Sequence, residues 1–400
     1  MQPVRVSALR GGTAVRLPRL ATASVVASTL LVAGLAGCTS DSGGSGGGSE
    51  TIVIAADLNN SSSVDTAYGR ALQLRVDQVN ASGRLGDRKL QLRTQDNRAD
   101  PTASLRNITT FADDPSVAAI VEGTCDQCMV GAAKTVNDKK VPTIVLAASD
   151  QVSQTVTPYL FKLGPNSSDS AVTMVNELRR LQVANAAILY SDDLYGRGGN
   201  TVLTAELDKA KIPLSGARSV KPAATDITQA VGTLTDANPA ALLVLTGPDQ
   251  AALAAKSAKN SGYKGKVFFD AAAAGDLFIP NDAVAATNNT TMVFTQTLAI
   301  DDVIATTPAK AARKQWFRDY ISRYGSYSGV GSFAADAVDL IAAAVARVGD
   351  DREQIRAIVE TSQVDGLSGP IRLTPANHSG LMPQALTLLV ARAGRWRLSS

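Results

Sequence analysis

Two of the three cysteines and the single histidine are the residues of this chain with the most obvious chemistry. Cys125 and Cys128 have the spacing C-x-x-C, which occurs in disulfides, in thioredoxin-like redox pairs and in halves of zinc sites. A zinc site needs further ligands, and the only histidine, His378, lies in the turn-like segment PANHSG, where we expect a solvated side chain. A nucleophilic hydrolase usually needs an imidazole base, and an ATPase needs a G-x-x-x-x-G-K-[ST] loop, which is missing here. These residues therefore argue for a protein that binds rather than catalyses, with no metal and no cofactor.

The third cysteine, Cys38, ends a leader sequence. Residues 1–37 contain four arginines and no acidic residue, and the segment 21–37 is uncharged and largely apolar. A basic region, an apolar region and small residues at a cleavage point are typical of a secretory signal peptide. The sequence LAGC also resembles the bacterial lipobox, in which the cysteine receives diacylglycerol and becomes the first residue of the mature protein. An ordinary signal peptide or a spanning helix is the alternative, although this apolar stretch is short for a span.

A flexible segment and a balanced charge follow the leader. Residues 39–50 (TSDSGGSGGGSE) are too rich in Gly and Ser to bury apolar surface, so we expect residues 38–50 to be a lipidated cysteine and a tether. Removing residues 1–37 takes away four of the 39 basic residues and none of the 36 acidic ones, which turns a formal net charge of +3 into −1. A nucleic-acid partner is not expected, because that function needs a clustered basic face. In an exported protein the Cys125/Cys128 pair most often forms a disulfide, and free or redox-active thiols are the alternative.

The body of the chain alternates short apolar runs with segments of helical periodicity. In the first half we expect strands at 51–57, 89–95, 117–122 and 143–147, and helices at 66–79, from 100–101 onward and at 132–137. In the second half we expect strands at 186–190, 241–245 and 266–270, an extended segment at 219–222, and helices at 168–181, 201–210, 227–236 and 250–261. A long helix at 333–348 and strands and turns over 369–397 complete the pattern. Two such sets predict an α/β fold of two Rossmann-like lobes, each a parallel sheet flanked by helices.

The loops after the strands are the expected binding elements. Ligands of open parallel sheets bind beyond the carboxyl ends of the strands. The first lobe supplies three such loops and the second lobe two, and they face each other across a cleft that would hold a small ligand. They cover residues 57–65, 123–129, 147–151, 191–196 and 270–275.

The succession of motifs resembles the type I periplasmic binding proteins, in the branch that binds branched-chain amino acids and amides for ABC importers. The likeness is carried by YG and the following VNASGRLGDRKLQLRTQDNRADP, by EGTCDQC, by VPTIVLAASD, by LYSDDLYG and by VDGLSGPIRLTPANHSG. Together these segments span nearly all of residues 51–396. The resemblance implies a three-stranded hinge, with lobe 1 at 51–163 plus 295–372 and lobe 2 at 164–294 plus 373–400.

The resemblance also implies a set of ligand-binding residues at the positions that match family motifs. Tyr68 and Tyr195 are the aromatic residues of two of these motifs, and each could instead be a core residue. Ser149 belongs to a loop whose N–H groups and hydroxyl would hold a ligand carboxylate or polar head, although it could simply cap a helix. The complete predicted set is Tyr68, Asp126, Gln127, Ala147, Ala148, Ser149, Tyr195 and Asp270.

Three departures from the family pattern bear on the ligand. Asp126 occupies a position where serine is common, and a carboxylate there would oppose a carboxylate ligand. Asp270 matches the acidic residue that holds a ligand ammonium only loosely. Cys125 follows the third expected strand, and some relatives pair the cysteine at this position with one that precedes the Asp-Pro. Here that earlier position is Ala99, which leaves Cys128 as the available partner of Cys125. The resemblance thus implies a local disulfide and a cationic, amide-like or polyol ligand.

The function implied is that of a monomeric lipoprotein on the extracytoplasmic face of a bacterial membrane. Its lobes would close on a small molecule, and the closed form would dock on an ABC permease. A lipid-anchored sensor or receptor subunit with the same fold is the alternative, and a thiol oxidoreductase built on Cys125 and Cys128 is a more remote one.

Overall fold

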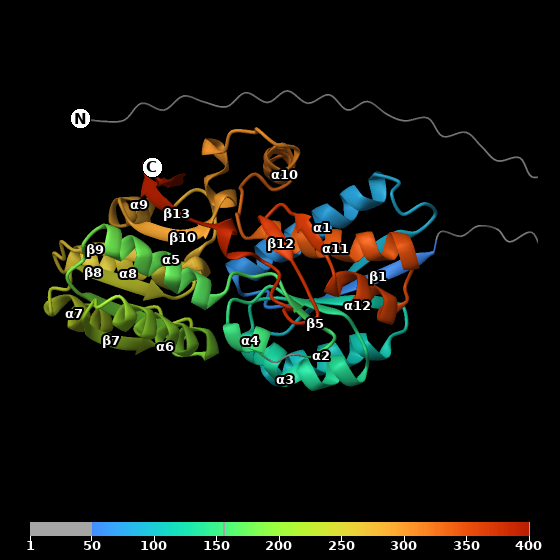
Figure 1. Ribbon diagram of the computed structural model, residues 1–400, viewed down its shortest axis with the longest axis horizontal. Coiled ribbons are helices and arrows are strands. Elements are labelled where there is room, and N and C mark those ends of the chain that lie inside the picture. The colour runs from blue at the N-terminus through green and yellow to red at the C-terminus, as the bar shows by residue number, and fades with distance from the viewer. Residues whose placement is uncertain (1–49, 155–156, 400) are drawn as a thin grey trace, which may run out of the picture. The chain divides into compact units, whose positions relative to one another are not determined.

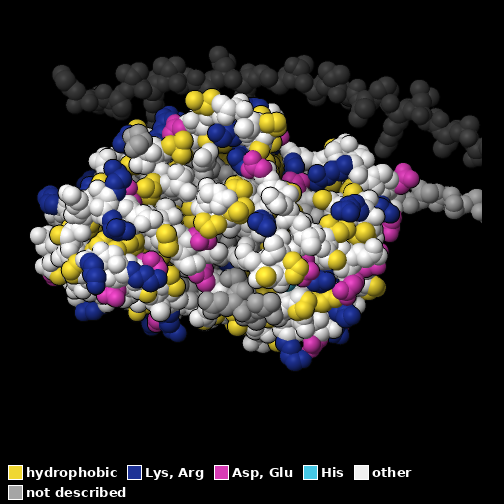
Figure 2. All heavy atoms as spheres, in the orientation of Figure 1, with side chains coloured by type: hydrophobic (Ala, Val, Ile, Leu, Met, Phe, Trp, Pro, Cys, Tyr) yellow, Lys and Arg dark blue, Asp and Glu magenta, His cyan; other side chains and the backbone are white. Residues whose placement is uncertain are grey.

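The structure is a computed structural model that describes residues 50–154 and 157–399, and these described residues form one compact unit. The predicted signal peptide, the lipidation site Cys38 and nearly all of the tether lie outside the described residues. No helix among the described residues is long and apolar enough to cross a membrane. On the face drawn in Figure 2, basic and acidic side chains are interspersed.

Lobe 1 is built on a five-stranded parallel sheet in the order β2-β1-β3-β4-β5. Figure 1 labels β1 and β5 of this sheet. Its strands are β1 (Thr51–Leu58), β2 (Lys89–Asp96), β3 (Val117–Glu122), β4 (Thr143–Val145) and β5 (Leu160–Lys162). The helices that follow them are α1 (Ser63–Ala81), α2 (Pro101–Asp113), α3 (Asp126–Asp138) and α4 (Asp150–Gln154). Two later helices, α11 (Gly331–Val348) and α12 (Arg352–Glu360), return to this lobe, where α11 packs on α1. β1 and β3 are buried along nearly their whole length because helices cover both faces of the sheet.

Lobe 2 is built on a seven-stranded sheet in the order β14-β13-β10-β9-β8-β6-β7. Its parallel strands are β6 (Ala186–Ser191), β7 (Leu214–Val220), β8 (Ala241–Leu245), β9 (Lys266–Phe269) and β10 (Thr291–Thr295). The last two strands, β13 (Leu386–Arg392) and β14 (Arg395–Leu398), extend the sheet in the antiparallel sense. α5 (Ser167–Arg180) and α6 (Leu194–Lys209) pack with each other, as do α7 (Thr228–Asp236) and α8 (Pro248–Asn260), and α9 (Asn281–Thr287) follows α8.

The chain passes between the two sheets three times. It leaves the first sheet after β5, returns after β10 through the short η2 (Gln296–Asp302) and α10 (Pro308–Tyr324), and leaves again after β12 (Pro370–Arg372), which pairs with β11 (Gln363–Asp365). Before the return, η2 is held on the second sheet by ion pairs from Arg395 and Arg397 of β14. The resemblance assigns residues 296–302 to lobe 1, whereas these ion pairs hold them on the sheet of lobe 2. The predicted lobe limits therefore remain a prediction.

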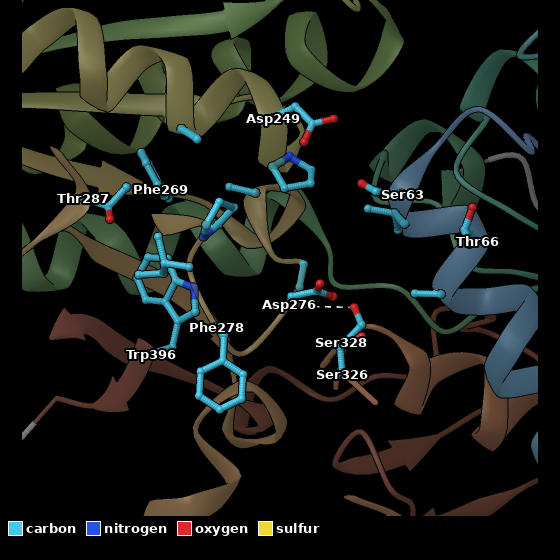
Figure 3. A pocket seen from close by; sticks show the side chains of 18 of the residues that line it. Ser63, Thr66, Asp249, Phe269, Asp276, Phe278, Thr287, Ser326, Ser328 and Trp396 are labelled. Atoms are coloured by element: carbon cyan, nitrogen blue, oxygen red, sulfur yellow. Dashed lines mark hydrogen bonds between the residues drawn. The ribbon is translucent and has the colours of Figure 1, made fainter. Parts of the chain in front are cut away.

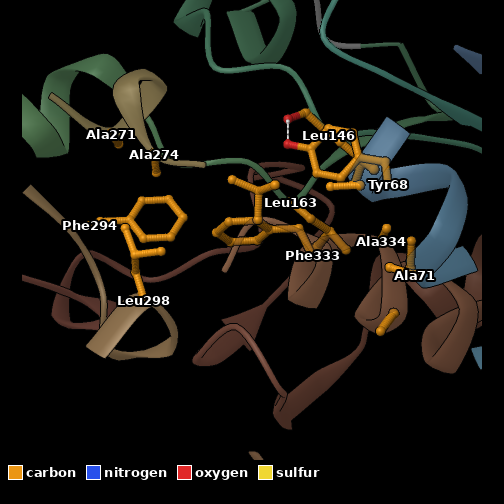
Figure 4. Close-up of a cluster of buried hydrophobic side chains, with 14 of the residues drawn as sticks. Tyr68, Ala71, Leu146, Leu163, Ala271, Ala274, Phe294, Leu298, Phe333 and Ala334 are labelled. Atoms are coloured by element: carbon orange, nitrogen blue, oxygen red, sulfur yellow. Dashed lines mark hydrogen bonds between the residues drawn. The ribbon is translucent and has the colours of Figure 1, made fainter. Parts of the chain in front are cut away.

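The hydrophobic core is continuous between the lobes. Tyr68 and Leu146 belong to lobe 1 and Phe294 to the last parallel strand of lobe 2, and all three lie in one buried cluster with Phe333 of α11 (Figure 4). The rings of Phe294 and Phe333 meet edge to face with centroids 5.8 Å apart. The two lobes are thus joined by an apolar, closely packed cluster. The edge-to-face contact of its two phenylalanine rings is a typical arrangement for aromatic side chains.

Several predicted elements differ from the structure. The extended segment expected at 219–222 overlaps only the end of a strand, Leu214–Val220, whose exposed edge position left its pattern polar. The helix expected at 132–137 begins earlier, at Asp126. No element was expected between residues 270 and 333, because this stretch mixes short apolar runs with a strongly charged segment. In the structure it forms α9, β10, η2 and α10.

The prediction that His378 is solvated is also wrong. Its side chain is 7% exposed and its ring stacks on Phe161 with centroids 4.5 Å apart. Nδ1 lies 2.8 Å from the Leu160 carbonyl oxygen and Nε2 lies 3.3 Å from Glu360. The turn around His378 folds back onto β5, so the histidine fastens the segment after β12 to the first sheet.

Candidate ligand-binding cleft

The inner pocket is a cavity of about 230 Å³ between the two lobes. The loops around it follow strands of both sheets, as the sequence analysis expected, and α11 closes one end. Four of the predicted ligand residues line it, namely Tyr68, Asp126, Ala148 and Tyr195. The other lining residues are Ser62, Val64, Thr124, Leu146, Pro165, Asp193, Gly247, Pro248, Ala271, Ala272, Ala274, Phe294, Val330 and Phe333.

Asp126 is the principal polar group on the lobe 1 side. It is the first residue of α3, immediately after the N-cap Cys125, and its side chain is 8% exposed. Its Oδ1 accepts a hydrogen bond of 3.0 Å from the Ser149 N–H. Burial raises the pKa of Asp126 to about 7, although this hydrogen bond and the positive charge of Lys162 act in the opposite direction. Asp126 can therefore be charged or neutral near neutral pH, depending on what occupies the pocket.

Tyr68 is both a core residue and a wall of the pocket. It lies on α1, is 4% exposed, and its hydroxyl donates a 3.2 Å hydrogen bond to the Leu146 carbonyl oxygen (Figure 4). Because that bond fixes the ring, one surface of the aromatic side chain faces the cavity while the rest is packed. The two alternatives weighed from the sequence are thus not exclusive.

Three other predicted ligand residues, Ala147, Ser149 and Gln127, do not line the inner pocket. Ala147 and Ser149 are buried, and the Ser149 hydroxyl accepts a hydrogen bond from the Gln151 N–H, which is a capping contact at the start of α4. Gln127 is exposed, because on a helix it points about 100° away from Asp126. For Gln127 and the Ser149 side chain, the structure offers no contact with the pocket.

On the lobe 2 side, Tyr195 and Asp270 form a buried pair. Tyr195 is 7% exposed and lines the pocket, and its hydroxyl donates a hydrogen bond to Oδ2 of Asp270. Asp270 lies behind the tyrosine, is 4% exposed, and its Oδ1 has no hydrogen-bond partner within the described part of the chain. Burial raises the pKa of Asp270 well above its usual range. Asp270 is therefore placed to orient Tyr195 rather than to touch a molecule in the inner pocket.

Two aspartates that the sequence analysis did not single out complete the polar frame. Asp193 lines the pocket as the N-cap of α6, and its Oδ1 accepts a 2.8 Å hydrogen bond from the Gly196 N–H. Asp65 lies in the first turn of α1, where its two oxygens accept from the N–H groups of Asn59 at 2.7 Å and Thr124 at 3.0 Å. Both positions have a sequence signal, since aspartate is favoured at helix N-termini.

Behind Asp65 and Asp126 lies a second layer of buried carboxyl groups. Asp57, at the end of β1, accepts hydrogen bonds from Asn97, Ser104 and Asn107. Glu122, at the end of β3, is fully buried, and neither of its oxygens receives a hydrogen bond from another described residue. Burial and the neighbouring Asp57 raise the pKa of Glu122 well above its usual range, which favours the neutral form of this carboxyl group.

The structure joins Cys125 and Cys128 in a disulfide, the arrangement that the sequence analysis favoured. The bond spans the first turn of α3, and Sγ of Cys125 accepts a hydrogen bond from the Cys128 N–H. It therefore stiffens the turn that carries Asp126. Within residues 50–154 and 157–399 there is no group of His, Cys, Asp and Glu side chains suited to a metal ion.

A neighbouring outer pocket of about 300 Å³ shares Val64 and Pro248 with the inner one (Figure 3). It lies on another side of α1, since Ser63, Ala67 and Arg70 line it whereas Tyr68 lines the inner pocket. On the lobe 2 side it is bounded by aromatic residues and by Asp276, which interacts with Ser328. No motif in the sequence indicated this pocket.

Comparison with known proteins agrees with this architecture. A model of the periplasmic binding protein family matches residues 56–395, so the chain belongs to that family. Comparison with curated protein sequences gave no match.

Solved structures share the fold over almost their whole length. An extracellular ligand-binding receptor from Rhodopseudomonas palustris HaA2 has a TM-score of 0.77 at 18% identity, covering 87% of this chain and 99% of its own. A leucine-binding protein from Thermotoga maritima MSB8 has a TM-score of 0.75 at 16% identity, covering 87% of this chain and 98% of its own. An ABC transporter substrate-binding protein from Desulfitobacterium hafniense, solved in complex with Leu, has a TM-score of 0.73 at 17% identity, covering 88% and 100%. At these identities the likeness establishes the fold, and the chain is an extracytoplasmic ligand-binding protein by family.

Proposed function

We propose that this protein is a lipid-anchored solute-binding protein that captures a small polar molecule, of the amino-acid, amide or similar class, and delivers it to an ABC importer. The observation that carries the proposal is the inner pocket, whose walls come from both lobes. A molecule that contacts Asp126 on one side and Tyr195 on the other stabilises the closed arrangement of the lobes, because it gains contacts that the open arrangement cannot provide.

The anchoring part of the proposal is supported by Cys38 and the Gly/Ser-rich segment after it. A tether of about 12 residues has a root-mean-square reach of roughly 20 Å, which keeps the lobes near a membrane-bound permease. Fractionation of cells producing the full chain tests this step. We expect the wild type in the membrane fraction and the Cys38→Ala variant outside it, and equal distributions would contradict lipid anchoring.

The binding part is tested by a thermal-shift screen of the purified full chain against amino acids, amides, amines, sugars and nucleosides. A ligand at 100 times its Kd adds about 2.7 kcal/mol to the stability of the folded state, which is an easily measured shift. Asp126→Ala and Tyr195→Ala should each reduce that shift. If both variants retain it in full, the ligand binds elsewhere.

The transport part requires a cellular measurement. Uptake of the identified ligand should fall when the gene is deleted and return when it is restored. Uptake that does not change on deletion would favour the alternative role of a lipid-anchored sensor.

A further inference from the structure

Four helices begin at the inner pocket, which at first sight favours an anionic ligand. Residues at or before the first turns of α1, α3, α6 and α8 line the cavity. The N-terminus of a helix carries unsatisfied N–H groups and a partial positive charge, so it attracts carboxylates and phosphates. Whether these N-termini are available to a ligand therefore decides which charge the pocket accepts.

The chain supplies its own carboxylate to each of these four helices. Asp65 lies in the first turn of α1, Asp126 in that of α3 and Asp249 in that of α8. Asp193 caps α6. Each of these negative charges opposes the partial positive charge of its helix N-terminus, and Asp193 also accepts a hydrogen bond from the Gly196 N–H of α6.

A fifth helix near the pocket, α5 of lobe 2, also has an aspartate at its N-terminus, and this aspartate comes from lobe 1. α5 begins just after Pro165, and its N-cap residue Asn166 makes no capping hydrogen bond through its side chain. Instead Asp150 of α4 accepts hydrogen bonds from the N–H groups of Ser167 at 2.7 Å and Ser168 at 2.9 Å. A lobe 1 carboxylate therefore occupies the place where a ligand anion would bind on lobe 2.

The backbone donor expected to hold a ligand carboxylate is occupied as well. The Ser149 N–H donates to Asp126, and the Ser149 hydroxyl is used at the start of α4. Asp126 thus stands where the carboxylate of a ligand would stand. A ligand carboxylate would have to displace it, and the displaced aspartate would remain buried beside a like charge.

Within the described lining of the inner pocket, no basic side chain balances these aspartates. Among the described residues, no Lys, Arg or His lines the inner pocket, whereas Asp126 and Asp193 do. The nearest cation, Lys162, is 1% exposed, and its Nζ donates to the carbonyl oxygens of Gly164 and Pro165 and to Oδ1 of Asn166. Those three acceptors satisfy all three N–H groups of the ammonium, so Lys162 has none left for a ligand.

We propose, on the basis of the function proposed above, that the inner pocket selects a small organic cation without a free carboxylate, such as a primary amine, an amidine or an amino-acid amide, with Asp126 as its counter-ion. Tyr195 faces Asp126 from the other lobe and adds an aromatic surface that favours a cation. The remaining walls are mainly apolar, which suits the hydrocarbon part of such a molecule. A cavity of about 230 Å³ limits it to a small one.

The test measures binding to the purified full chain by calorimetry, with three probes that share one side chain. Isoamylamine is a cation, leucine a zwitterion and 4-methylpentanoate an anion, and leucinamide, agmatine and choline are added as further cations. We expect at least one cation to bind ten times more tightly than leucine, and no binding of the anion. Tighter binding of leucine or of the anion would overturn the proposal and leave the proposed function intact, as would binding of a neutral polyol alone. If no compound of any class binds, both the cation proposal and the proposed function fail.

The role of Asp126 is tested with Asp126→Asn. We expect affinity for the cation to fall at least tenfold, because the amide keeps the shape but not the charge. Asp138→Asn is the matched control, since Asp138 ends the same helix and is paired on the surface with Lys134. An Asp126→Asn variant that binds the cation as the wild type does would overturn the assignment of the counter-ion.

A second measurement uses only the wild-type protein and so does not depend on the variant's folding. The groups around Asp126 are Lys162 of β5, Asp150 of α4, Asp193 before α6, Tyr68 of α1 and Glu122 of β3. Since burial raises the pKa of Asp126 to about 7, the carboxylate is neutralised as the pH falls below that value. We expect cation affinity to drop several-fold from pH 8 to pH 6. Affinity that is constant or higher at pH 6 would contradict an ionised Asp126 as the partner.

Discussion

Lobe 1 faces the cleft with buried carboxyl groups, whereas lobe 2 faces it mainly with small and apolar side chains. Asp126 lines the lobe 1 wall, and Asp65, Asp57 and Glu122 lie buried behind it, with backbone N–H groups holding Asp65 and Asp126. The lobe 2 wall consists largely of alanines and Pro248, with Tyr195 and the capping Asp193 as its polar members.

The difference indicates a division of work between the lobes. Polar groups that are fixed by several hydrogen bonds can recognise a charge without rearranging, which is what lobe 1 offers. Small and apolar groups can approach a bound molecule and exclude water from it, which is what lobe 2 offers. We therefore expect lobe 1 to decide which ligand binds and lobe 2 to decide how tightly it is enclosed.

The largest effect should come from adding one methyl group to lobe 2. A Cβ at position 196 would overlap the Ser191 carbonyl oxygen, so Gly196→Ala forces the loop between β6 and α6 to move. Overpacking of this kind costs about 3 kcal/mol of the free energy of unfolding, which urea denaturation measures. Gly198→Ala is the control on the same helix, where a Cβ meets no atom within 4 Å, and it should be neutral or stabilising. Equal effects of the two variants would contradict a rigid lobe 2 loop.

The corresponding change in lobe 1 is Asp65→Ala. It leaves the partly buried N–H groups of Asn59 and Thr124 without their acceptor, which costs about 2 kcal/mol. Asp77→Ala on the same helix removes a surface ion pair with Arg323 and an exposed hydrogen bond from Gln73, and it should cost about 0.5 kcal/mol. Denaturation of both variants is the measurement. A result in which Asp65→Ala is as mild as Asp77→Ala would mean that the lobe 1 wall is not pre-organised.

The buried acids should also make the stability of the ligand-free protein depend on pH. Burial raises the pKa of Asp65 to about 6 and those of Asp126 and Asp336 to about 7, above the 3.8 of an exposed aspartate. At a pH between the unfolded-state pKa and the folded-state pKa, the folded protein keeps protons that the unfolded protein has released. The free energy of unfolding therefore falls as the pH rises from about 4 to about 7. We expect urea unfolding to give a higher free energy of unfolding at pH 5 than at pH 8, by more than the roughly 1.4 kcal/mol that one pKa unit represents. Higher stability at pH 8 would show that these carboxyl groups are ionised in the fold.

The smallest effect should come from Tyr195→Phe, which tests the enclosing role of lobe 2. The change removes the hydroxyl that donates to Asp270 and keeps the ring. We expect a loss of about 1 kcal/mol in stability and a weaker ligand affinity by a few-fold. Tyr190→Phe, on β6 and outside the pocket lining, is the control and should leave affinity unchanged. A Tyr195→Phe affinity equal to that of the wild type would assign Tyr195 to packing alone.

Much of the fold could be predicted because its signals are local. The apolar runs of β1, β3, β6 and β8 and the Asp100-Pro101 start of α2 are readable without knowledge of distant residues. The strand β7 and the segment from α9 to α10 could not be read in this way. β7 is an exposed edge strand, and α10 is so polar that its hydrophobic periodicity is weak.

The candidate site was predictable only in part, for the same reason. Tyr68, Asp126, Ala148 and Tyr195 follow from motifs and their position after strands, and all four line the pocket. Phe294 and Phe333 also line it, but they come from β10 and α11, and no pattern in the sequence links them to the loops. Gln127 was predicted because it adjoins Asp126, and Ser149 because it matches a family motif. Gln127 is exposed, and the Ser149 hydroxyl accepts a hydrogen bond from the Gln151 N–H.

The sequence by itself determined the two α/β lobes, the family and the cysteine pair, because periodicity, helix signals and motif order are properties of neighbouring residues. Only the tertiary structure decided how the polar groups of the cleft are used. It brings the Ser149 N–H to Asp126, Asp150 to the start of α5, and His378 into a buried contact with β5. These contacts join residues that are not neighbours in the chain, so each depends on the folded structure. The contact of Asp150 also depends on the placement of the two lobes. The charge that the pocket offers to a ligand is a consequence of that placement.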